Sequence, residues 1–175
     1  MKTLSAFLVG LALAVSTQAA ELQPRAGFAV SGSFGVNAPT GEEAHFSGRR
    51  SGAGFSLAGD YSPRRWFSLG VASGYSAPAT DSSGEFHDTT VYLAGFAQLN
   101  AHLGGWRPFL QTGVGHYKFR SNDTSGAFAG LGIEVPVARD WFVPLTVRYH
   151  QVRTIHEQDP DFVEWRIGIT RRLGH

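Results

Sequence analysis

The sequence has no cysteine and few charged residues. Without cysteine, the 175-residue chain can form neither a disulfide scaffold nor a thiolate zinc site. Asp, Glu, Lys and Arg make up only 17% of the chain, below the roughly 25% of an average soluble domain. The formal net charge is +1, and the arginines are scattered instead of lining one face. We therefore expect no nucleic-acid partner.

The sequence also lacks an apolar run long enough for a transmembrane helix, which needs about 18 to 20 residues. Its longest apolar run, Ala6 to Val15, follows a basic start at Met1-Lys2 and precedes the small residues Ala19 and Ala20. This order is typical of a secretory signal peptide. We predict a signal peptide over residues 1–20 and an exported domain over residues 21–175; a core helix or membrane anchor is the alternative for the first segment.

Glycine and aromatic residues are abundant. The chain has 22 glycines, 13 phenylalanines, 5 tyrosines and 4 tryptophans. A chain this aromatic can bury enough apolar surface to offset the entropy lost on folding, so disorder is excluded. The composition indicates a β protein.

Apolar and polar residues alternate with a period of two, and no helical period is present. Alternation of this kind is typical of β-strands with one apolar face. Eight segments show it: Arg25–Val36, Ala53–Tyr61, Trp66–Tyr75, Thr90–Leu103, Arg107–Arg120, Gly126–Val137, Trp141–Gln151 and Phe162–Leu173. In the fifth segment the pattern is ambiguous, and we place Phe109, Gly113, Gly115, Tyr117 and Phe119 on the outward face.

The connections between these segments alternate in character. Polar loops are expected over residues 37–50, 77–88, 121–125 and 152–161, and tight turns over residues 62–65, 104–105 and 139–140. Short turns at one end and longer loops at the other are typical of outer-membrane barrels. The fold class predicted is all-β, an eight-stranded antiparallel up-and-down transmembrane β-barrel.

Charged residues segregate to the face opposite the apolar one. Because an arginine or lysine facing lipid at the bilayer midplane costs about 2–4 kcal/mol, the apolar face is expected outside and the charged face inside. Buried charges must be paired, so we predict a salt-bridge network that plugs the lumen, with Glu134–Arg148 as its leading pair. Its predicted members are Asp60, Lys118, Glu134, Arg148, Glu164 and Arg166. The alternative is a soluble periplasmic barrel of lipocalin type, with the apolar face inside.

Several segments resemble small OmpA-like and OmpX-like outer-membrane β-barrels. The stretch from Trp106 to Tyr117 (WRPFLQTGVGHY) resembles the family's fifth strand, and Gly126–Tyr149 resembles strands six and seven. The resemblance implies an eight-stranded barrel in a Gram-negative outer membrane, inserted by the barrel-assembly machinery. One departure is the C-terminus, which ends Leu173-Gly174-His175 where the family usually ends in an aromatic residue.

Some barrels of this size modify lipid A with a serine and a histidine, so an enzyme is the runner-up hypothesis. A nucleophile needs a base within hydrogen-bond reach and a third group that orients the base. The candidates are Ser121, Ser125, His150 and His156 with Asp123 or Asp159, but none forms the His-x-Ser pattern of deacylase barrels. We therefore expect no enzyme, no cofactor and no metal site, since His45, His87 and His156 lack ligand spacing.

The remaining expectation is a surface function. The first two loops hold aromatic and charged residues that could contact a surface partner or the lipopolysaccharide headgroup: Phe46, Arg49, Arg50, Phe86 and His87. The expected partners are outer-membrane lipid and lipopolysaccharide, with the barrel-assembly machinery during insertion, and we expect a monomer. Solvation of the outer rim alone is the simpler interpretation of these residues.

Overall fold

A computed structural model describes residues 27–40, 51–78, 89–119, 122–153 and 161–173 of the chain. These residues form eight strands: β1 (Gly27–Pro39), β2 (Gly52–Arg64), β3 (Phe67–Pro78), β4 (Thr90–Asn100), β5 (Arg107–Phe119), β6 (Asn122–Ala138), β7 (Trp141–Arg153) and β8 (Phe162–Leu173). The predicted signal peptide over residues 1–20 lies outside the described residues, so it stays a prediction.

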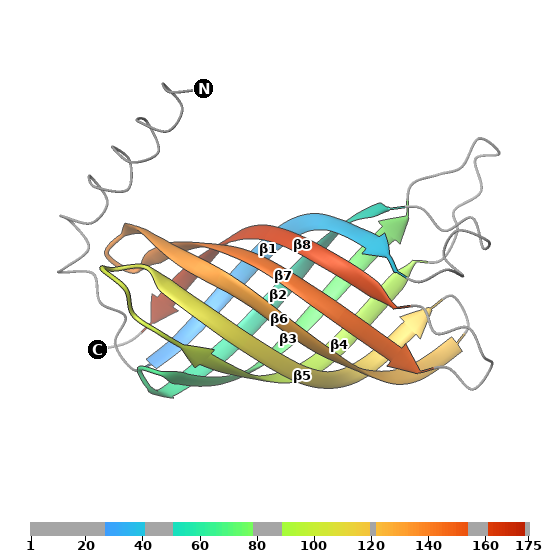
Figure 1. The fold of residues 1–175 in the computed structure, drawn as a ribbon, viewed down its shortest axis with the longest axis horizontal. Coiled ribbons are helices and arrows are strands. Elements are labelled where there is room, and N and C mark those ends of the chain that lie inside the picture. The colour runs from blue at the N-terminus through green and yellow to red at the C-terminus, as the bar shows by residue number, and fades with distance from the viewer. Residues whose placement is uncertain (1–26, 41–50, 79–88, 120–121, 154–160, 174–175) are drawn as a thin grey trace, which may run out of the picture.

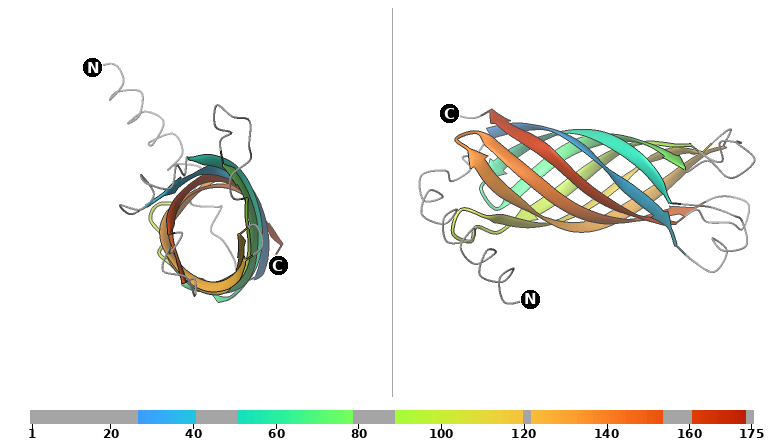
Figure 2. Two further views of the ribbon diagram at one scale, coloured as in Figure 1. Left: turned by 90° about the vertical axis from the view of Figure 1, so that its right-hand side faces the viewer. Right: turned by 90° about the horizontal axis from the view of Figure 1, so that it is seen from above.

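The strands close into a barrel in which each strand pairs antiparallel with its neighbour in sequence, and β1 pairs with β8. Figure 1 shows the strands crossing the long axis at a tilt, and the end-on view in Figure 2 shows the closed ring. This arrangement confirms the predicted fold class. No helix in the described part of the chain is long and apolar enough to cross a membrane.

Tight turns join the strands at one end of the barrel. The β4–β5 hairpin turns at Gly104 and Gly105, whose φ angles are +57° and +92°. Two successive positive φ angles match a type I′ turn, which fits the right-handed twist of the flanking strands and favours glycine at both positions. Leu103 and Trp106 close this turn with two backbone hydrogen bonds of 2.9 and 3.0 Å.

Two other connections differ slightly from the prediction. Strand β2 continues through an irregularity to Arg64, so the β2–β3 turn lies at Arg65 and Trp66. At the opposite end, β6 begins at Asn122 and occupies most of the predicted loop 121–125. The β5–β6 connection is therefore much shorter than the other connections at that end.

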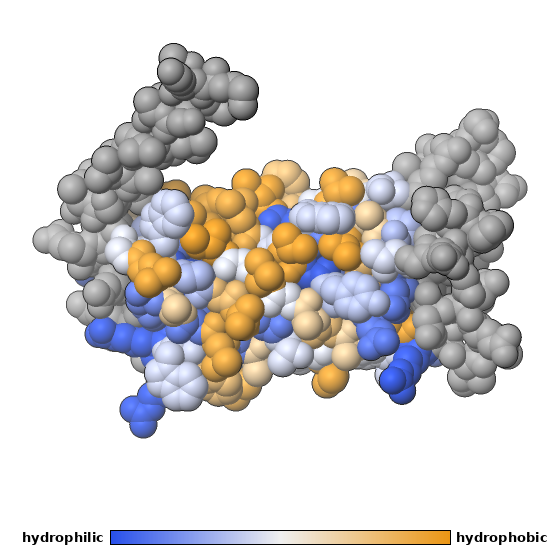
Figure 3. Space-filling view, in the orientation of Figure 1, coloured by the Kyte–Doolittle hydropathy of each residue, from blue (hydrophilic) through white to orange (hydrophobic). Residues whose placement is uncertain are grey.

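Apolar side chains face outward along all eight strands. Each strand carries large hydrophobic residues that are exposed on the outer surface, such as Phe34 (67%), Leu69 (50%) and Leu131 (59%). Figure 3 shows hydrophobic side chains gathered over the middle of the barrel and hydrophilic ones nearer its ends. An apolar belt around a closed sheet is what hydrocarbon surroundings require, and it is the reverse of a lipocalin-type interior.

The predicted phase of the fifth strand is wrong. Leu110 and Val114 face outward, with 61% and 70% exposure, whereas Phe109 and Tyr117 are buried in the lumen. His116 and Lys118 share the outward face with the leucine and valine, but they lie near the end of the strand. A charge near the membrane interface costs little, so their presence did not mark an inward face.

Inward glycines make room for the aromatic rings that fill the lumen. A Cβ at Gly74 would lie 2.4 Å from the Tyr92 ring, and one at Gly132 would lie 2.4 Å from the Phe109 ring. Gly113 lies in the same way beneath the Phe128 ring. Each ring therefore packs over a position of the neighbouring strand that has no side chain, and this packing accounts for part of the high glycine content.

We predict that an arginine in the apolar belt destabilises the barrel according to its depth. Leu131 lies near the middle of β6, so Leu131→Arg should lower the free energy of unfolding by about 2–4 kcal/mol, and Val137→Arg, near the turn end of the same strand, by about 0–1 kcal/mol. Urea unfolding in lipid vesicles, followed by tryptophan fluorescence, measures both. Equal costs at the two positions would contradict an outward belt.

The packing of glycine against aromatic rings gives a second prediction. Gly74→Ala should lower the free energy of unfolding by about 1–3 kcal/mol because the new methyl group displaces the Tyr92 ring. Gly95→Ala is the matched control, since a Cβ at Gly95 meets nothing within 4 Å. The same unfolding assay compares the two variants, and a neutral Gly74→Ala would show that the ring does not pack as described.

Candidate functional site: the polar lumen

A cluster of polar side chains around Glu164 crosses the lumen. Its members are Tyr92 on β4, Gln111 and Tyr117 on β5, Arg148 and His150 on β7, and Glu164 and Arg166 on β8; we call it the Glu164 cluster. Arg166 Nη2 lies 2.5 Å from Glu164 Oε1, and Arg148 Nη1 lies 3.4 Å from Oε2. All three side chains are at least nine-tenths buried.

Tyr92 connects this cluster to the opposite wall of the barrel. Its hydroxyl donates to Glu164 Oε2 at 3.4 Å and accepts from Arg148 Nη1 at 3.3 Å. In a ring of eight strands β4 and β8 face each other, so the Tyr92–Glu164 contact spans the full width of the lumen. Arg148 Nη2 also donates to Gln111 Oε1 on β5 at 3.3 Å.

Aromatic rings surround His150 beside this cluster. The imidazole stacks on Phe162 with ring centroids 4.3 Å apart, and it lies within 5.8 Å of the Tyr92, Tyr117 and Phe128 rings. Its Nδ1 is hydrogen-bonded to the Tyr117 hydroxyl at 2.9 Å, and Nε2 lies 3.6 Å from Glu164 Oε2. His150 is fully buried, so this layer leaves little free cross-section.

A second cluster surrounds Glu134 nearer the tight-turn end. We call it the Glu134 cluster; it comprises Asp60, Ser62, Ser68, Asn100, Arg107, Glu134 and Arg172. Arg172 Nη2 lies 2.8 Å from Glu134 Oε2, and Arg107 Nη1 lies 3.3 Å from the same oxygen.

Hydroxyl and amide groups extend the Glu134 cluster to β3. Arg107 Nη2 and Asn100 Nδ2 both donate to Ser68 Oγ, at 3.2 and 3.1 Å. Arg107 is 1% exposed and Ser68 is fully buried. The contacts join β3 to β5, β6 and β8, so this cluster also crosses the lumen.

Most of the predicted lumen residues lie inside the barrel, with one correction. Glu134, Arg148, Glu164 and Arg166 are buried, and Asp60 faces inward beside Ser62 and Ser68. Lys118 does not belong to the network, because it lies exposed on the outward face of β5. That error follows directly from the wrong phase of this strand.

The predicted Glu134–Arg148 pair is also wrong. In the β6–β7 register Arg148 lies opposite Gly130, and Glu134 lies opposite Pro144, four residues away along the strand. Four residues correspond to about 13 Å, so the two groups belong to different clusters. Glu134 pairs with Arg107 and Arg172, and Arg148 pairs with Glu164.

The predicted network lacked several members of the two clusters, among them Arg172, Arg107, Tyr117 and Tyr92. Arg172 has the same parity as Glu164 and Arg166 on β8, so the alternation of that strand could have found it. Arg107 and Tyr117 were missed because β5 was phased incorrectly. Tyr92 had the inward parity, but nothing in the sequence indicated that its hydroxyl reaches the opposite wall.

Two of the catalytic candidates from the sequence, Ser125 and Asp123, lie on the outward face of β6 near its first residues. Ser125 is opposite His116 on β5, and Asp123 Oδ1 lies 3.5 Å from His116 Nε2. The histidine and aspartate side chains are 60% and 58% exposed. The Ser125 hydroxyl makes no hydrogen bond to a described residue, so these groups do not form an oriented relay. Ser121, His156 and Asp159 lie outside the described residues.

The loop candidates cannot be placed in the structure. Phe46, Arg49, Arg50, Phe86 and His87, and the histidines His45 and His156, fall outside the described residues. Within the described residues, no group of three or more His, Asp or Glu side chains could hold a metal ion.

In the β4–β5 connection, burial lowers the pKa of His102, and the positive charges of Arg107 and Arg65 lower it further.

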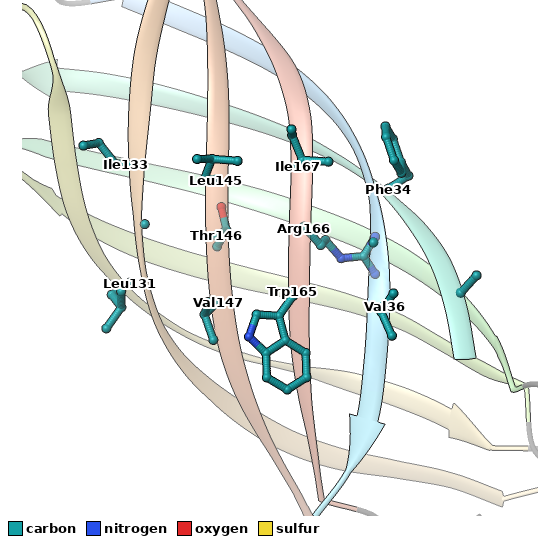
Figure 4. A pocket seen from close by; sticks show the side chains of 13 residues that line it. Phe34, Val36, Leu131, Ile133, Leu145, Thr146, Val147, Trp165, Arg166 and Ile167 are labelled. Carbon is teal, nitrogen blue, oxygen red and sulfur yellow. The ribbon is translucent and has the colours of Figure 1, made fainter. Parts of the chain in front are cut away.

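A groove of about 790 Å³ indents the outer surface across five neighbouring strands, from β6 through β7, β8 and β1 to β2. Figure 4 shows the apolar side chains along it, which come from β6, β7, β8 and β1: Leu131, Ile133, Leu145, Val147, Trp165, Ile167, Phe34 and Val36. Its lining is almost entirely apolar, and it lies within the exposed belt. A groove of this chemistry suits lipid acyl chains.

A closed barrel with an apolar belt outside and ion pairs inside defines a transmembrane β-barrel protein. Residues 5–172 match the family model of the outer membrane protein beta-barrel domain. The chain belongs to this family of outer-membrane barrels. Short turns in such barrels face the periplasm and longer connections face the exterior, so the Glu134 cluster is on the periplasmic side and the Glu164 cluster on the extracellular side.

Several solved structures have a similar fold. Neisserial surface protein A matches with a TM-score of 0.71 and 12% identity over 84% of this chain and 97% of its own. The outer membrane protein OprG of Pseudomonas aeruginosa matches with 0.61 and 13% over 88% and 100%. The outer membrane enzyme PagL matches with 0.52 and 12% over 83% and 99%. No curated protein matches the sequence. At these identities the likeness shows the fold alone.

We predict that Glu164→Gln destabilises the barrel strongly. The substitution leaves the Arg148 and Arg166 guanidinium groups buried without a carboxylate, which should lower the free energy of unfolding by about 3–5 kcal/mol. Asp123→Asn removes a carboxylate whose partner, His116, is exposed, so it should change stability little. Urea unfolding in vesicles distinguishes the two, and a Glu164→Gln barrel as stable as wild type would contradict the network.

Proposed function

We propose that the chain is a non-enzymatic outer-membrane barrel that serves membrane integrity or surface interaction and conducts no appreciable flow of solutes. The observation that carries this proposal is the Tyr92–Glu164 contact, which crosses the lumen from β4 to β8. Together with the Glu134 cluster it places two layers of bonded side chains across the path. Removing water from charged groups is costly, so a network in which carboxylates pair with arginines favours a closed lumen over an open pore.

The outer surface supports the absence of catalysis. Catalysis by a serine requires a histidine nitrogen directed at the serine and a third group on the other nitrogen. At the extracellular rim, Asp123 contacts the Nε2 atom of His116, and no described residue holds the Ser125 hydroxyl. The similarity to PagL, at 12% identity, extends to the fold alone.

We further propose that the extracellular loops act at the surface. Arg49 and Arg50 provide guanidinium groups for lipopolysaccharide phosphates, and Phe46, Phe86 and His87 add aromatic contacts in the same loops. Insertion by the barrel-assembly machinery, removal of residues 1–20 as a signal peptide and a monomeric state complete the proposal.

A lipid bilayer experiment tests the closed lumen. Purified protein in a planar bilayer should give no stable open channel. Tyr92→Ala with Arg148→Ala removes the side chains that bridge the Glu164 layer, and Glu134→Ala with Arg172→Ala opens the Glu134 layer, so the four changes together should give a channel. Val147→Ala, adjacent to Arg148 but facing outward, is the matched control and should behave as wild type. A large, steady conductance of the wild-type protein would contradict the proposal.

Mass spectrometry of lipid A tests the absence of catalysis. Cells that express the protein should contain the same lipid A species as cells with an empty vector. A lost or gained acyl chain that depends on Ser125, so that Ser125→Ala abolishes it, would show that the barrel is an enzyme.

A further inference from the structure

The charges inside the barrel do not balance. The described inward residues include four arginines, Arg107, Arg148, Arg166 and Arg172, but only three carboxylates, Asp60, Glu134 and Glu164. The Glu134 cluster has equal numbers of guanidinium and carboxyl groups, Arg107 and Arg172 with Glu134 and Asp60. The surplus lies in the Glu164 cluster, where two guanidinium groups share one carboxylate.

The unpartnered polar atoms of the Glu164 cluster are mainly donors. Arg166 Nε and Nη1, Arg148 Nε and Gln111 Nε2 are buried and have no hydrogen-bond partner among the described residues. All three residues are at least nine-tenths buried. Figure 4 shows the Arg166 side chain extending from β8 toward β1. On β1, Asn37 Oδ1 also lacks a partner among the described residues. This oxygen could accept a hydrogen bond, but a neutral amide would not compensate the surplus positive charge of the arginines.

A surplus guanidinium in this position has a strong attraction for an anion. Two unit charges about 4 Å apart interact several times more strongly in a protein interior than in bulk water, because the effective dielectric constant is lower. An arginine cannot relieve the surplus by losing its proton. An anion that accepts N–H groups would satisfy both the charge and the orphaned donors.

We propose that the Glu164 cluster contains a binding site for a small monovalent anion such as chloride, held by Arg166 and Arg148. The anion is small because the Arg148 guanidinium packs over the Phe128 ring at 5.3 Å and donates to the Tyr92 hydroxyl at 3.3 Å, which leaves little room beside it. The inference goes beyond the proposed function, because the contacts between side chains that close the lumen are present whether or not an anion binds.

The stability of the barrel in different salts tests the site. A ligand that binds only the folded state raises the midpoint of unfolding. Wild-type protein in uncharged lipid vesicles should therefore unfold at higher urea in sodium chloride or bromide than in sodium gluconate of equal ionic strength. Arg166→Gln should lose this difference, since it removes the surplus charge. Lys118→Gln removes an exposed cation of the outer face and should keep it.

Three outcomes would overturn the proposal: equal midpoints for wild type in chloride and gluconate, a full chloride effect in Arg166→Gln, or loss of the effect in Lys118→Gln, which would indicate general salt screening. If Arg166→Gln does not fold, crystals of the wild-type protein grown in bromide decide the question. Anomalous scattering should place a bromide ion within hydrogen-bond distance of Arg166 and Arg148, and a lumen without one would contradict the site.

Discussion

Hydrocarbon offers no hydrogen-bond partner for a backbone N–H or C=O group, and this constraint governs the whole structure. A sheet in such surroundings must have no free edge, and the pairing of β1 with β8 removes the last one. Closure with eight strands leaves a lumen that side chains can span. The width of the barrel, set by backbone pairing, is therefore what allows Tyr92 on β4 to reach Glu164 on β8.

The same constraint sorts the side chains. Outward positions must be apolar across the hydrocarbon, so every group that carries charge at mid-depth has to face inward, where it meets other charges at short distance. The inward charges are mostly arginines and carboxylates. Among the described residues, four guanidinium groups share three carboxylates, and several of them also donate to hydroxyl or amide groups. Arginine suits this role because its five donors can contact several partners at once. Glycines opposite the aromatic rings provide the space that these large side chains need.

Sequence alternation predicts the strands well because a lipid-facing belt tolerates few exceptions at mid-depth. It fails on β5, where His116 and Lys118 share the outward face with Leu110 and Val114; near the interface the rule relaxes, and parity there carries no information. It was harder still to predict which inward charged residues form ion pairs with one another. The register of β6 and β7 places Glu134 four residues from Arg148, and alternation along one strand contains no signal for such an offset. The Tyr92 contact depends on the position of β4 across the ring, which only closure determines. The loops that we propose to act at the surface lie mostly outside the described residues, and neither strand alternation nor barrel closure bears on them.

The central claim is that adjacent residues of one strand face lipid and lumen in turn. Because the chain has no cysteine, single cysteines at Leu145 and Thr146 can each carry a nitroxide label in vesicle-inserted protein. Molecular oxygen, which concentrates in hydrocarbon, should relax the label at 145 strongly and the label at 146 weakly. The opposite order, or equal relaxation at both positions, would contradict the account.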